Sequence, residues 1–423
     1  MKGILNKLNI VFKDDSLRGK IFFTLGALVI FRILAIIPIS GVDTSRLAQF
    51  FSSNQFFGLL NVFSGGGLSQ LSIVMLGVGP YITASIIMQL LTIMIPKLKE
   101  MYQEEGEVGR RKFSQYSRLL TVPLALIQGF SFIKILESQA VISEITGLAL
   151  ITNLILITAG SVLLMWIGEL ISEYGVGNGI SLLIFAGIVA VLPTQISQFV
   201  FTFDPSQIPL YIIFVIISLL VIAGVVIITE AERPIPVTYA KQVRGNRVYG
   251  GTSTYLPLRV NQAGVIPIIF ALSILLFPQM IVQFLQNVGN TTIQSIATSV
   301  LNILANQWFY GITYFLLVFV FTYFYTAVTF DPDQISTNLQ KNGAFIPGVR
   351  PGKSTSEHIS RILTRLTLVG ASFLGFVAVL PLIIQYMTGI TAISVGGTGL
   401  LIVVSVVIDL IKKIDSQASI REY

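Results

Sequence analysis

The side chains that most often perform catalysis are scarce in this chain. It has one histidine, His358, no cysteine, and no HExxH, CxxC or GxSxG motif. The residues that usually bind a catalytic metal, or act as a nucleophile beside a base, are therefore missing. A phosphate-binding loop of the P-loop type is absent as well, and the lack of cysteine excludes a disulfide framework. An enzyme is consequently the less favoured class of protein.

The composition predicts a protein that is embedded in a membrane. Of the 423 residues, 53% are hydrophobic and 11% are charged, whereas a soluble domain is about 25% charged. The mean hydropathy is +0.82. The apolar residues lie in runs near the roughly 20 residues that a helix needs to cross the hydrocarbon core. The net charge of +7 does not require nucleic acid, because the basic residues lie between these runs, where membrane topology explains them first.

Ten apolar segments predict ten transmembrane helices. They comprise residues 21–39, 71–95, 119–136, 148–171, 180–199, 208–228, 265–284, 309–330, 366–386 and 390–411. Pro193 shortens the apolar run of the fifth segment, which could therefore also be a re-entrant piece. Residues 1–20 combine basic and apolar side chains at roughly helical spacing, and they predict a cytoplasmic amphipathic helix at the membrane surface.

The basic residues alternate between the connecting loops. They gather in residues 1–20, 97–112, 233–259 and 341–365 and again after the last apolar segment, whereas the opposite loops contain only Arg46 and, at one edge, Lys134. Short loops that are translocated across a membrane are poor in Lys and Arg, so both termini are predicted to be cytoplasmic. Two termini on one side require an even number of spans, which supports ten.

The ten segments divide evenly near residues 201–209. This gives an N-terminal half, residues 21–200, a C-terminal half, residues 201–412, and a cytoplasmic tail, residues 413–423. If the halves are structural repeats, five spans in each would make the second half enter from the opposite face. No similarity between the halves is visible in the sequence, so an inverted repeat rests on parity alone.

The segment of residues 56–70, FFGLLNVFSGGGLSQ, is apolar but too short to cross a membrane. Its run from Gly65 to Gly67 would break a helix. Non-helical backbone at membrane depth is tolerated only where protein buries it or where it lines a watery cavity. The segment is therefore predicted to fold back into the helix bundle. The alternative is an outer loop with an apolar helix lying on the outer face.

A secondary transporter with inverted repeats is the main alternative function from the residues alone. Such a protein would need ionisable groups near the middle of the membrane. Apart from Arg32, the charged residues nearest the spans are Glu169, Glu230 and Asp409, and these lie toward the cytoplasmic ends. A relay for protons or sodium ions is therefore poorly supplied.

Six segments resemble a single family of membrane proteins. They are VFSGGGLSQLSIVMLGVGPYITASIIMQLL (62–91), EGEVGRRKFSQYSRLLT (105–121), GVGNGISLLIFAGIVAVLP (175–193), YAKQVRGNRVYGGTSTYLPLRVNQAGVIPIIF (239–270), GAFIPGVRPGKST (343–355) and GGTGLLIVVSVVIDL (396–410). In this order they resemble the bacterial members of the SecY/Sec61-alpha family of protein translocase subunits. The resemblance runs from the first span to the last.

The resemblance implies an all-α integral membrane protein, with ten transmembrane helices in two inverted five-helix halves around a central hourglass pore. It implies a protein-conducting channel of the Sec translocon, which moves unfolded secretory proteins across the membrane and releases transmembrane segments into lipid through a lateral gate. Such a channel is passive and has no cofactor. A partner ATPase, the ribosome or the proton-motive force would supply the energy.

By motif, the resemblance places a re-entrant plug and a pore ring in this chain. The plug falls on Asn61, Val62, Phe63, Ser64, Gly65, Gly66, Gly67 and Leu68. The ring falls on six branched aliphatic residues: Val78, Ile82, Ile180, Ile184, Ile269 and Ile402. Such a ring excludes ions by dewetting and can deform around a passing chain. Without the resemblance, isoleucines that face lipid would be the simpler interpretation.

The resemblance also places a lateral gate between the second span and the seventh, with the third span nearby. The gate residues are Thr83, Ser85, Ile86, Gln128 and Phe277. Polar groups there could close the gate through hydrogen bonds between helices that are worth about 0.6 kcal/mol each. Ordinary helix packing without gating is the alternative.

The longest cytoplasmic stretches are predicted at about residues 229–262 and 331–361. The first alternates like a β-hairpin with turn glycines, and GVRPG in the second presents an arginine on a rigid tip. The resemblance implies that these loops receive partners, and docking is accordingly assigned to Lys241, Arg244, Arg247 and Arg350. The alternative for all four is a role in membrane orientation only, and for Lys241 neither interpretation is favoured.

The resemblance implies a set of partners and a location. The partners are the small membrane subunits SecE and SecG, the ATPase SecA, the ribosome with its RNA phosphates, signal sequences, unfolded preproteins and the lipid bilayer. The location would be the bacterial plasma membrane, which the chain would cross several times.

Overall fold

The computed structural model describes residues 14–39, 61, 64–138, 142, 145, 147–201, 205, 208–240, 242–244, 247–249, 253–285, 291–388 and 391–419. Most of the predicted amphipathic helix of residues 1–20 lies outside these residues and stays a prediction. The first described helix begins after Asp14, whose carboxylate accepts hydrogen bonds from the backbone N–H groups of Ser16 and Leu17. This is a regular N-terminal cap.

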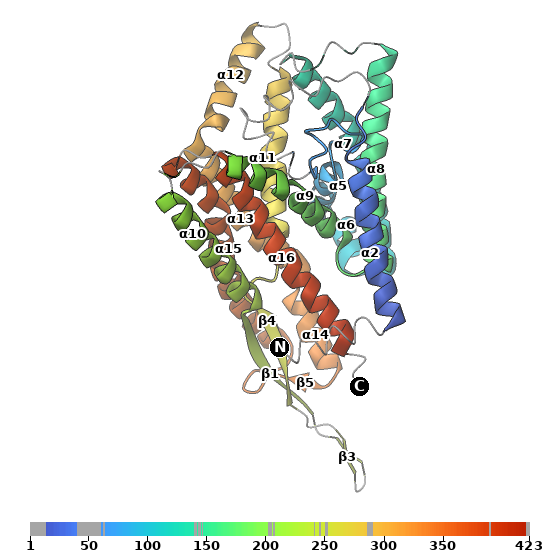
Figure 1. Cartoon of the computed structure of the whole chain (residues 1–423). Helices are drawn as coiled ribbons and strands as arrows, with labels where there is room; N and C mark the ends of the chain where they lie inside the picture. Colours follow the sequence, from blue (N-terminus) through green and yellow to red (C-terminus); the bar gives the residue numbers. More distant parts are fainter. Residues whose placement is uncertain are drawn as a thin grey trace. The chain divides into compact units, whose positions relative to one another are not determined.

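Within the described residues, ten long helices coincide with the ten predicted segments (Figure 1). They are α2 (Asp15–Leu34), α5 (Gly79–Met94), α7 (Gly106–Ser138), α8 (Leu148–Tyr174), α9 (Gly179–Phe201), α10 (Ile208–Glu230), α11 (Ile266–Leu285), α13 (Gln307–Thr329), α15 (Lys353–Thr388) and α16 (Thr391–Ser419). Pro193 lies inside α9, so it does not end that helix. Each of the ten predicted segments therefore coincides largely with a helix.

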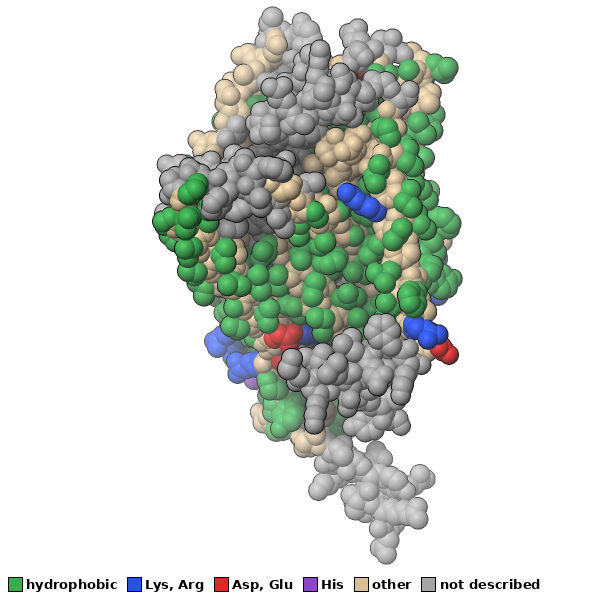
Figure 2. All heavy atoms as spheres, in the orientation of Figure 1, with side chains coloured by type: hydrophobic (Ala, Val, Ile, Leu, Met, Phe, Trp, Pro, Cys, Tyr) green, Lys and Arg blue, Asp and Glu red, His purple; other side chains and the backbone are tan. Residues whose placement is uncertain are grey.

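Five of the described helices are long and apolar enough, each by itself, to cross a membrane: α7, α8, α10, α13 and α15. A sixth span would combine α5 with α6 (Pro96–Gln103), which follows after a bend of 115°. The bend occurs at Ile95, whose extended backbone is the conformation preferred before a proline. Hydrophobic side chains cover most of the helical surface in Figure 2. The chain is therefore a mainly helical, multi-pass membrane protein.

The predicted start of the second span was wrong. The apolar run begins at Leu71, but the helix begins at Gly79, and the residues between them form turns. Leu71 and Gly77 have φ angles of 43° and 59°, which a right-handed helix does not contain. Pro80 lies in the first turn of this helix, where helix starts favour proline. Hydropathy alone could not distinguish these buried turns from a helix.

Three described helices outside the predicted spans were not predicted: α6, α12 (Thr291–Ala305) and α14 (Pro332–Lys341). In α12, apolar residues such as Ile296, Val300 and Ile303 recur at spacings of four and three, which is the signal of an amphipathic helix. In α14, Asp331 caps the N-terminus and Pro332 occupies the first turn, as helix starts favour. Both signals are present in the sequence.

The described chain forms two compact units. The first comprises Met1–Pro209, Leu272–Tyr310 and Pro381–Tyr423, and the second comprises Leu210–Ala271 and Gly311–Leu380. The first break lies beside the predicted junction of the two halves. Residues 272–310 and 381–423, although in the C-terminal half of the sequence, cluster with the first unit. The inverted relation between the halves stays a prediction.

Helices of the first unit pack closely around its irregular segment. In this unit α2 contacts α8 and α9, α5 contacts α7 and α8, and α16 runs along α9. The close approach of α8 to the segment before α5 requires Gly160, since a Cβ atom there would overlap with the carbonyl group of Ile73. These contacts hold non-helical backbone inside a helical unit.

The second unit contains a small antiparallel sheet of order β4-β1-β5. Its strands are β1 (Glu232–Tyr239), β4 (Ser253–Arg259) and β5 (Ala344–Phe345), and between β1 and β4 lies a separate hairpin of β2 (Gln242–Arg244) and β3 (Arg247–Tyr249). The sheet has its own apolar core, formed by Ile235, Val237, Leu258, Ala344, Ile346 and Ile359. The predicted hairpin is confirmed, and the all-α description holds for the helical part but omits this sheet.

Candidate functional site

The glycine-rich segment before α5 folds into a compact turn. The Asn61 carboxamide oxygen accepts a hydrogen bond from the backbone N–H of Ser69, 2.8 Å away. The Ser64 hydroxyl accepts one from the N–H of Leu68 and donates one to the carbonyl group of Asn61, both at 3.0 Å. Gly65 and Gly66 have φ angles of 70° and 79°, a conformation that glycine adopts without strain. Among the predicted plug residues, Val62 and Phe63 lie outside the described residues.

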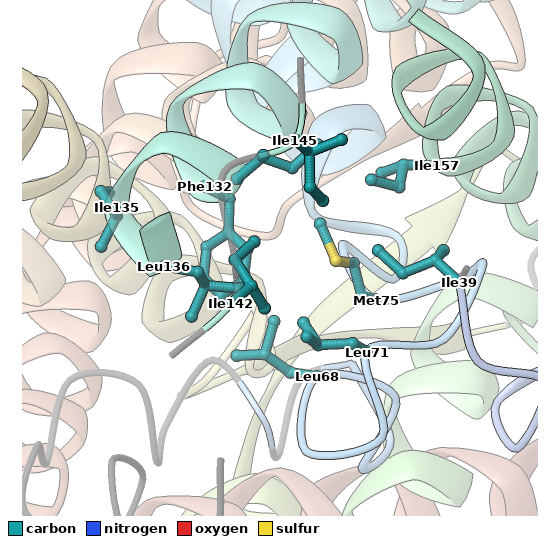
Figure 3. Close-up of a cluster of buried hydrophobic side chains, with 11 residues drawn as sticks. Ile39, Leu68, Leu71, Met75, Phe132, Ile135, Leu136, Ile142, Ile145 and Ile157 are labelled. Atoms are coloured by element: carbon teal, nitrogen blue, oxygen red, sulfur yellow. The ribbon is translucent and has the colours of Figure 1, made fainter. Parts of the chain in front are cut away.

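One end of this segment is anchored in an apolar cluster (Figure 3). Leu68, Leu71 and Met75 pack there with side chains of the neighbouring elements. The other members are Ile39, Phe132, Ile133, Ile135, Leu136, Ile142, Ile145 and Ile157. A backbone bridge adds to the anchor, because the N–H of Ile39 donates to the carbonyl group of Leu71, and the N–H of Ile73 donates to that of Ile37. Most of the described part of the predicted segment, Asn61 and residues 64–70, is therefore buried in the first unit, as predicted for re-entrant backbone.

The other end lies between α2 and α9. The Arg32 guanidinium of α2 donates a hydrogen bond to the carbonyl oxygen of Gly65, with Nη1 and the oxygen 2.7 Å apart. A Cβ atom on Gly65 would lie 2.5 Å from Cζ of Phe31 and 3.1 Å from Cα of Gly187 in α9. A Cβ atom on Gly66 would lie 3.7 Å from a methyl group of Val191. Only glycine fits at position 65.

Two predicted ring residues share a helix face with the residues that contact this segment. In α9, Ile180, Ile184, Gly187 and Val191 are separated by four, three and four positions, which places them on one face. The segment touches that face at positions 187 and 191. The predicted plug therefore contacts the same face of α9 that carries two of the predicted ring residues.

The remaining ring residues lie on three other helices. Val78 is the N-terminal cap of α5, and Ile82 lies one turn further along. Ile402 is buried on α16, which packs along α9. Ile269 is buried in the second unit, on α11. All four are buried apolar side chains, and the ring itself stays a prediction.

The start of α9 is held tightly against α8. The Ser172 hydroxyl donates to the carbonyl group of Gly168 at 3.0 Å and accepts from the N–H of Gly179 at 2.9 Å. A Cβ atom on Gly168 would overlap with Cδ1 of Ile180, and one on Gly179 would overlap with the Gly168 carbonyl group. Ile180 therefore packs at least partly against α8. The glycines of the motif at 175–179 were the sequence signal for this contact.

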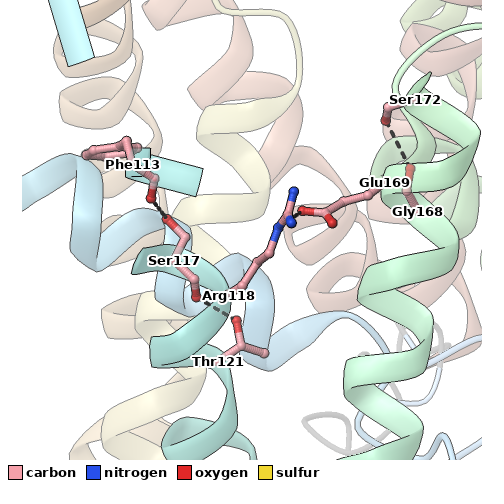
Figure 4. A network of polar contacts seen from close by, with 7 residues as sticks. All are labelled: Phe113, Ser117, Arg118, Thr121, Gly168, Glu169 and Ser172. Atoms are coloured by element: carbon pink, nitrogen blue, oxygen red, sulfur yellow. Dashed lines mark hydrogen bonds and ion pairs between the residues drawn. The ribbon is translucent and has the colours of Figure 1, made fainter. Parts of the chain in front are cut away.

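An ion pair joins α7 to α8 near the same level of α8 (Figure 4). Nε of Arg118 lies 2.6 Å from Oε1 of Glu169. Along α7, the Ser117 hydroxyl donates to the carbonyl group of Phe113, and the Thr121 hydroxyl donates to that of Ser117. The sequence placed Glu169 near the cytoplasmic end of its span but gave no partner for it. The pair fixes α8, and through Gly168 it supports the start of α9.

The predicted gate residues show bonds within their own helix. The Thr83 hydroxyl donates to the carbonyl group of Gly79 at 3.0 Å, and Nε2 of Gln89 donates to the Ser85 hydroxyl at 3.3 Å, both within α5. Ile86 on α5 and Gln128 on α7 are buried. The side chain of Phe277 on α11 lies outside the described residues. A polar contact across the gate stays a prediction.

Three of the predicted docking residues, Arg244, Arg247 and Arg350, lie at two turns of the second unit. Arg244 and Arg247 are register partners at the end of the β2–β3 hairpin, and their side chains lie outside the described residues, as does Lys241. Arg350 is exposed in the turn before α15, where its carbonyl group accepts a hydrogen bond from the Thr355 hydroxyl at 2.8 Å. This agrees with the predicted rigid, exposed tip.

Comparison with known proteins identifies the family. The family model described as SecY matches residues 72–411. The protein translocase subunit SecY of Mycobacterium bovis is 41% identical, with 96% of each chain covered, and that of Corynebacterium glutamicum is 43% identical with the same coverage. A solved protein-conducting channel is 20% identical with a TM-score of 0.66, and the match covers 96% of this chain and 93% of that one. Canine Sec61, from a ribosome-channel complex of the endoplasmic reticulum, is 19% identical with a TM-score of 0.61 and the same coverage. The chain belongs to the SecY family.

Proposed function

We propose that this protein is the central, protein-conducting channel subunit of a Sec translocon. It passes unfolded secretory proteins across the membrane and releases transmembrane segments into lipid through a lateral gate. Relatives that are 41% identical over 96% of the chain are protein translocase subunits. A solved relative of the same fold has a plug domain that stabilises the closed state of its translocation channel.

One observation in this chain carries the proposal. Non-helical, glycine-rich backbone is buried inside a helical membrane unit, where it meets the α9 face that bears Ile180 and Ile184. Irregular backbone at membrane depth needs burial or a watery cavity. A segment that is attached by turns, and not by a helix, can be displaced without unfolding a span. A removable plug over an apolar constriction accounts for both features.

The channel is proposed to be passive and to depend on partners. SecE and SecG would complete the membrane complex, and SecA, the ribosome or the proton-motive force would supply energy. Solved structures of this fold include a canine ribosome-channel complex and a yeast Ssh1 complex bound to the 80S ribosome, which supports a ribosome partner. The proposed location is the bacterial plasma membrane with both termini in the cytoplasm, because the basic loops lie on that side.

The sheet of the second unit is the proposed docking surface for these cytoplasmic partners. Its apolar core holds β1, β4 and β5 together and includes Ile359 of α15, so the turn that bears Arg350 is fixed at both ends. Gly348 and Gly352 have φ angles of 82° and 96°, which keep this turn tight. Tyr255 on β4 and Arg350 in the turn before α15 are both exposed, so the sheet presents an aromatic ring and a guanidinium to a partner. Such side chains are frequent at binding hot spots.

Arg350→Glu should slow translocation without disturbing the membrane part. Reversing a charge at a docking surface replaces attraction by repulsion, so we expect a decrease of about tenfold in SecA-driven export. Topology should survive, since Lys341, Lys353, Arg361 and Arg365 remain in the same loop. The measurement is protease-protected preprotein in vesicles that contain the complete complex.

Lys353→Glu is the matched control for Arg350→Glu. It makes the same change of charge three positions away, at the start of α15, where a carboxylate suits the helix dipole. Export by this variant should stay near the wild-type rate. Wild-type export by Arg350→Glu, or equal losses in both variants, would contradict docking through Arg350 and leave orientation as the role of these charges.

A further inference from the structure

The predicted plug is held in two physically different ways. We call residues 64–67 the plug tip and residues 68–75 the plug anchor. The anchor is fixed by the apolar cluster of Figure 3 and by the backbone bridge between Pro38 and Ser72. Among the described residues, the tip meets α2 through the hydrogen bond from Arg32 to Gly65, and it approaches α9 closely at Gly187 and Val191. The tip can therefore be released while the anchor stays in place.

The contacts of the anchor are extensive and long-range. Leu68, Leu71 and Met75 are almost fully buried against residues of α7 and α8. Moving this part would expose several large apolar side chains and break two backbone hydrogen bonds. Both changes are unfavourable. Burial of apolar area stabilises a fold in proportion to that area, and each buried backbone group that loses its hydrogen-bond partner destabilises it.

Among the described residues, the one hydrogen bond between the tip and α2 or α9 comes from Arg32. Nη1 of this residue lies 2.7 Å from the Gly65 carbonyl oxygen, across 33 positions of sequence. Arg32 lies in the last turn of α2, within the first predicted span. A basic side chain in a membrane-spanning helix is unfavourable unless it finds a partner, so its pairing is a candidate for function.

Arginine is well suited to a hydrogen bond that holds the plug tip in the closed channel and breaks when the channel opens. Its planar guanidinium makes stronger hydrogen bonds to carbonyl groups than a neutral donor does. When the bond breaks, its long stem can carry the charged group toward water at the membrane surface. The Phe31 ring of the same helix lies beside Gly65, where an added Cβ atom would be 2.5 Å from its Cζ.

We propose that Arg32 is the positioning residue that latches the plug tip, and that opening releases this tip about Gly65 to Gly67 while the anchor remains in place. This inference rests on the proposed plug function. It assigns the closed position of the plug to one side chain of α2. It also predicts which residues of the segment move.

Single cysteines can test this inference, because the chain has no cysteine of its own. Ser64→Cys reports on the tip, and Ser72→Cys reports on the anchor; the two serines are 2% and 0% exposed. Each probe is combined with Arg32→Met, which keeps a long side chain but removes the donor. Reaction with a maleimide is measured in the complete complex in membrane vesicles.

The expected result separates tip from anchor. A hydrogen bond to a charged group contributes about 1.5–3 kcal/mol, so Arg32→Met should speed labelling at position 64 by about tenfold or more. Labelling at position 72 should not change. Arg32→Lys should give an intermediate rate, since it keeps the charge but not the planar donor group. Ile33→Met is the matched control on the same helix, where Ile33 is 57% exposed, and it should leave both rates unchanged.

Two outcomes would overturn the latch. Unchanged labelling at position 64 in Arg32→Met would show that this bond does not hold the tip. Equal increases at positions 64 and 72 would show general loosening of the unit instead of release of the tip. Ion conductance, measured without cysteine probes, gives a second reading: Arg32→Met should raise it. If deleting the tip fails to raise conductance, the plug function is wrong, while the labelling still decides whether Arg32 holds the segment.

Discussion

Deletion of residues 62–67 should leave a folded protein that leaks ions at rest. The deletion removes the plug tip but keeps Asn61 and Leu68. The Asn61 side chain is hydrogen-bonded to the backbone N–H of Ser69, so the two cut ends already lie close together. Leu68 stays because it belongs to the buried cluster with Ile133 and Ile145.

The leak follows from the loss of the contacts that hold the tip against α9. With no tip to close the resting channel, conductance should rise about tenfold or more above wild type. The measurement is conductance of the purified complex in planar bilayers. Co-purification with the small subunits and an unchanged melting temperature control for folding. Wild-type conductance in a correctly assembled deletion variant would count against the plug assignment.

Ile82→Asn and Ile402→Asn should each loosen the selection of signal sequences. Both isoleucines are buried, on α5 and α16. A polar amide in an apolar constriction attracts water and removes the dewetted barrier that keeps the channel closed. An asparagine without partners destabilises the closed state by about 1–3 kcal/mol. Preproteins with defective signal sequences should then be exported roughly tenfold more efficiently.

Two control variants show whether position and polarity matter. Ile82→Val keeps an apolar branched side chain at the same site and should retain normal selection. Ile93→Asn introduces the same amide on α5 at a residue that is 65% exposed, and selection should again be normal. The assay compares export of preproteins with intact and defective signals. Rejection of the defective signals by both the Ile82 and the Ile402 variants would mean that these residues do not form the constriction.

Local features of the chain were readable in the sequence. Apolar runs long enough for a membrane gave the positions of the helices, since hydropathy depends on the residues of one segment only. Alternation and turn glycines gave the hairpin of the second unit. Gly348, Pro351 and Gly352 predicted the exposed turn of Arg350. A turn depends mainly on its own few residues, so the sequence of one segment is enough to predict it.

Helix boundaries and bends were less predictable. The second span begins at Gly79, eight positions after its apolar run begins at Leu71, because buried turns and buried helices have the same hydropathy. The helix α12 was missed because its amphipathic spacing is not a membrane-length run. Hydropathy indicates which residues are buried, but it does not indicate their backbone conformation. It therefore cannot locate the start of a helix.

The sequence by itself determined a multi-pass helical membrane protein, with an irregular segment before the second span and an arginine at the end of the first. Tertiary structure alone decided that Arg32 bonds to Gly65, that Leu68 joins the apolar cluster of Figure 3, and that Gly168 lies against Ile180. These contacts join residues far apart in the chain. Which distant residues meet depends on how the surfaces of the helices fit together. The pattern of residues within one segment does not determine this fit.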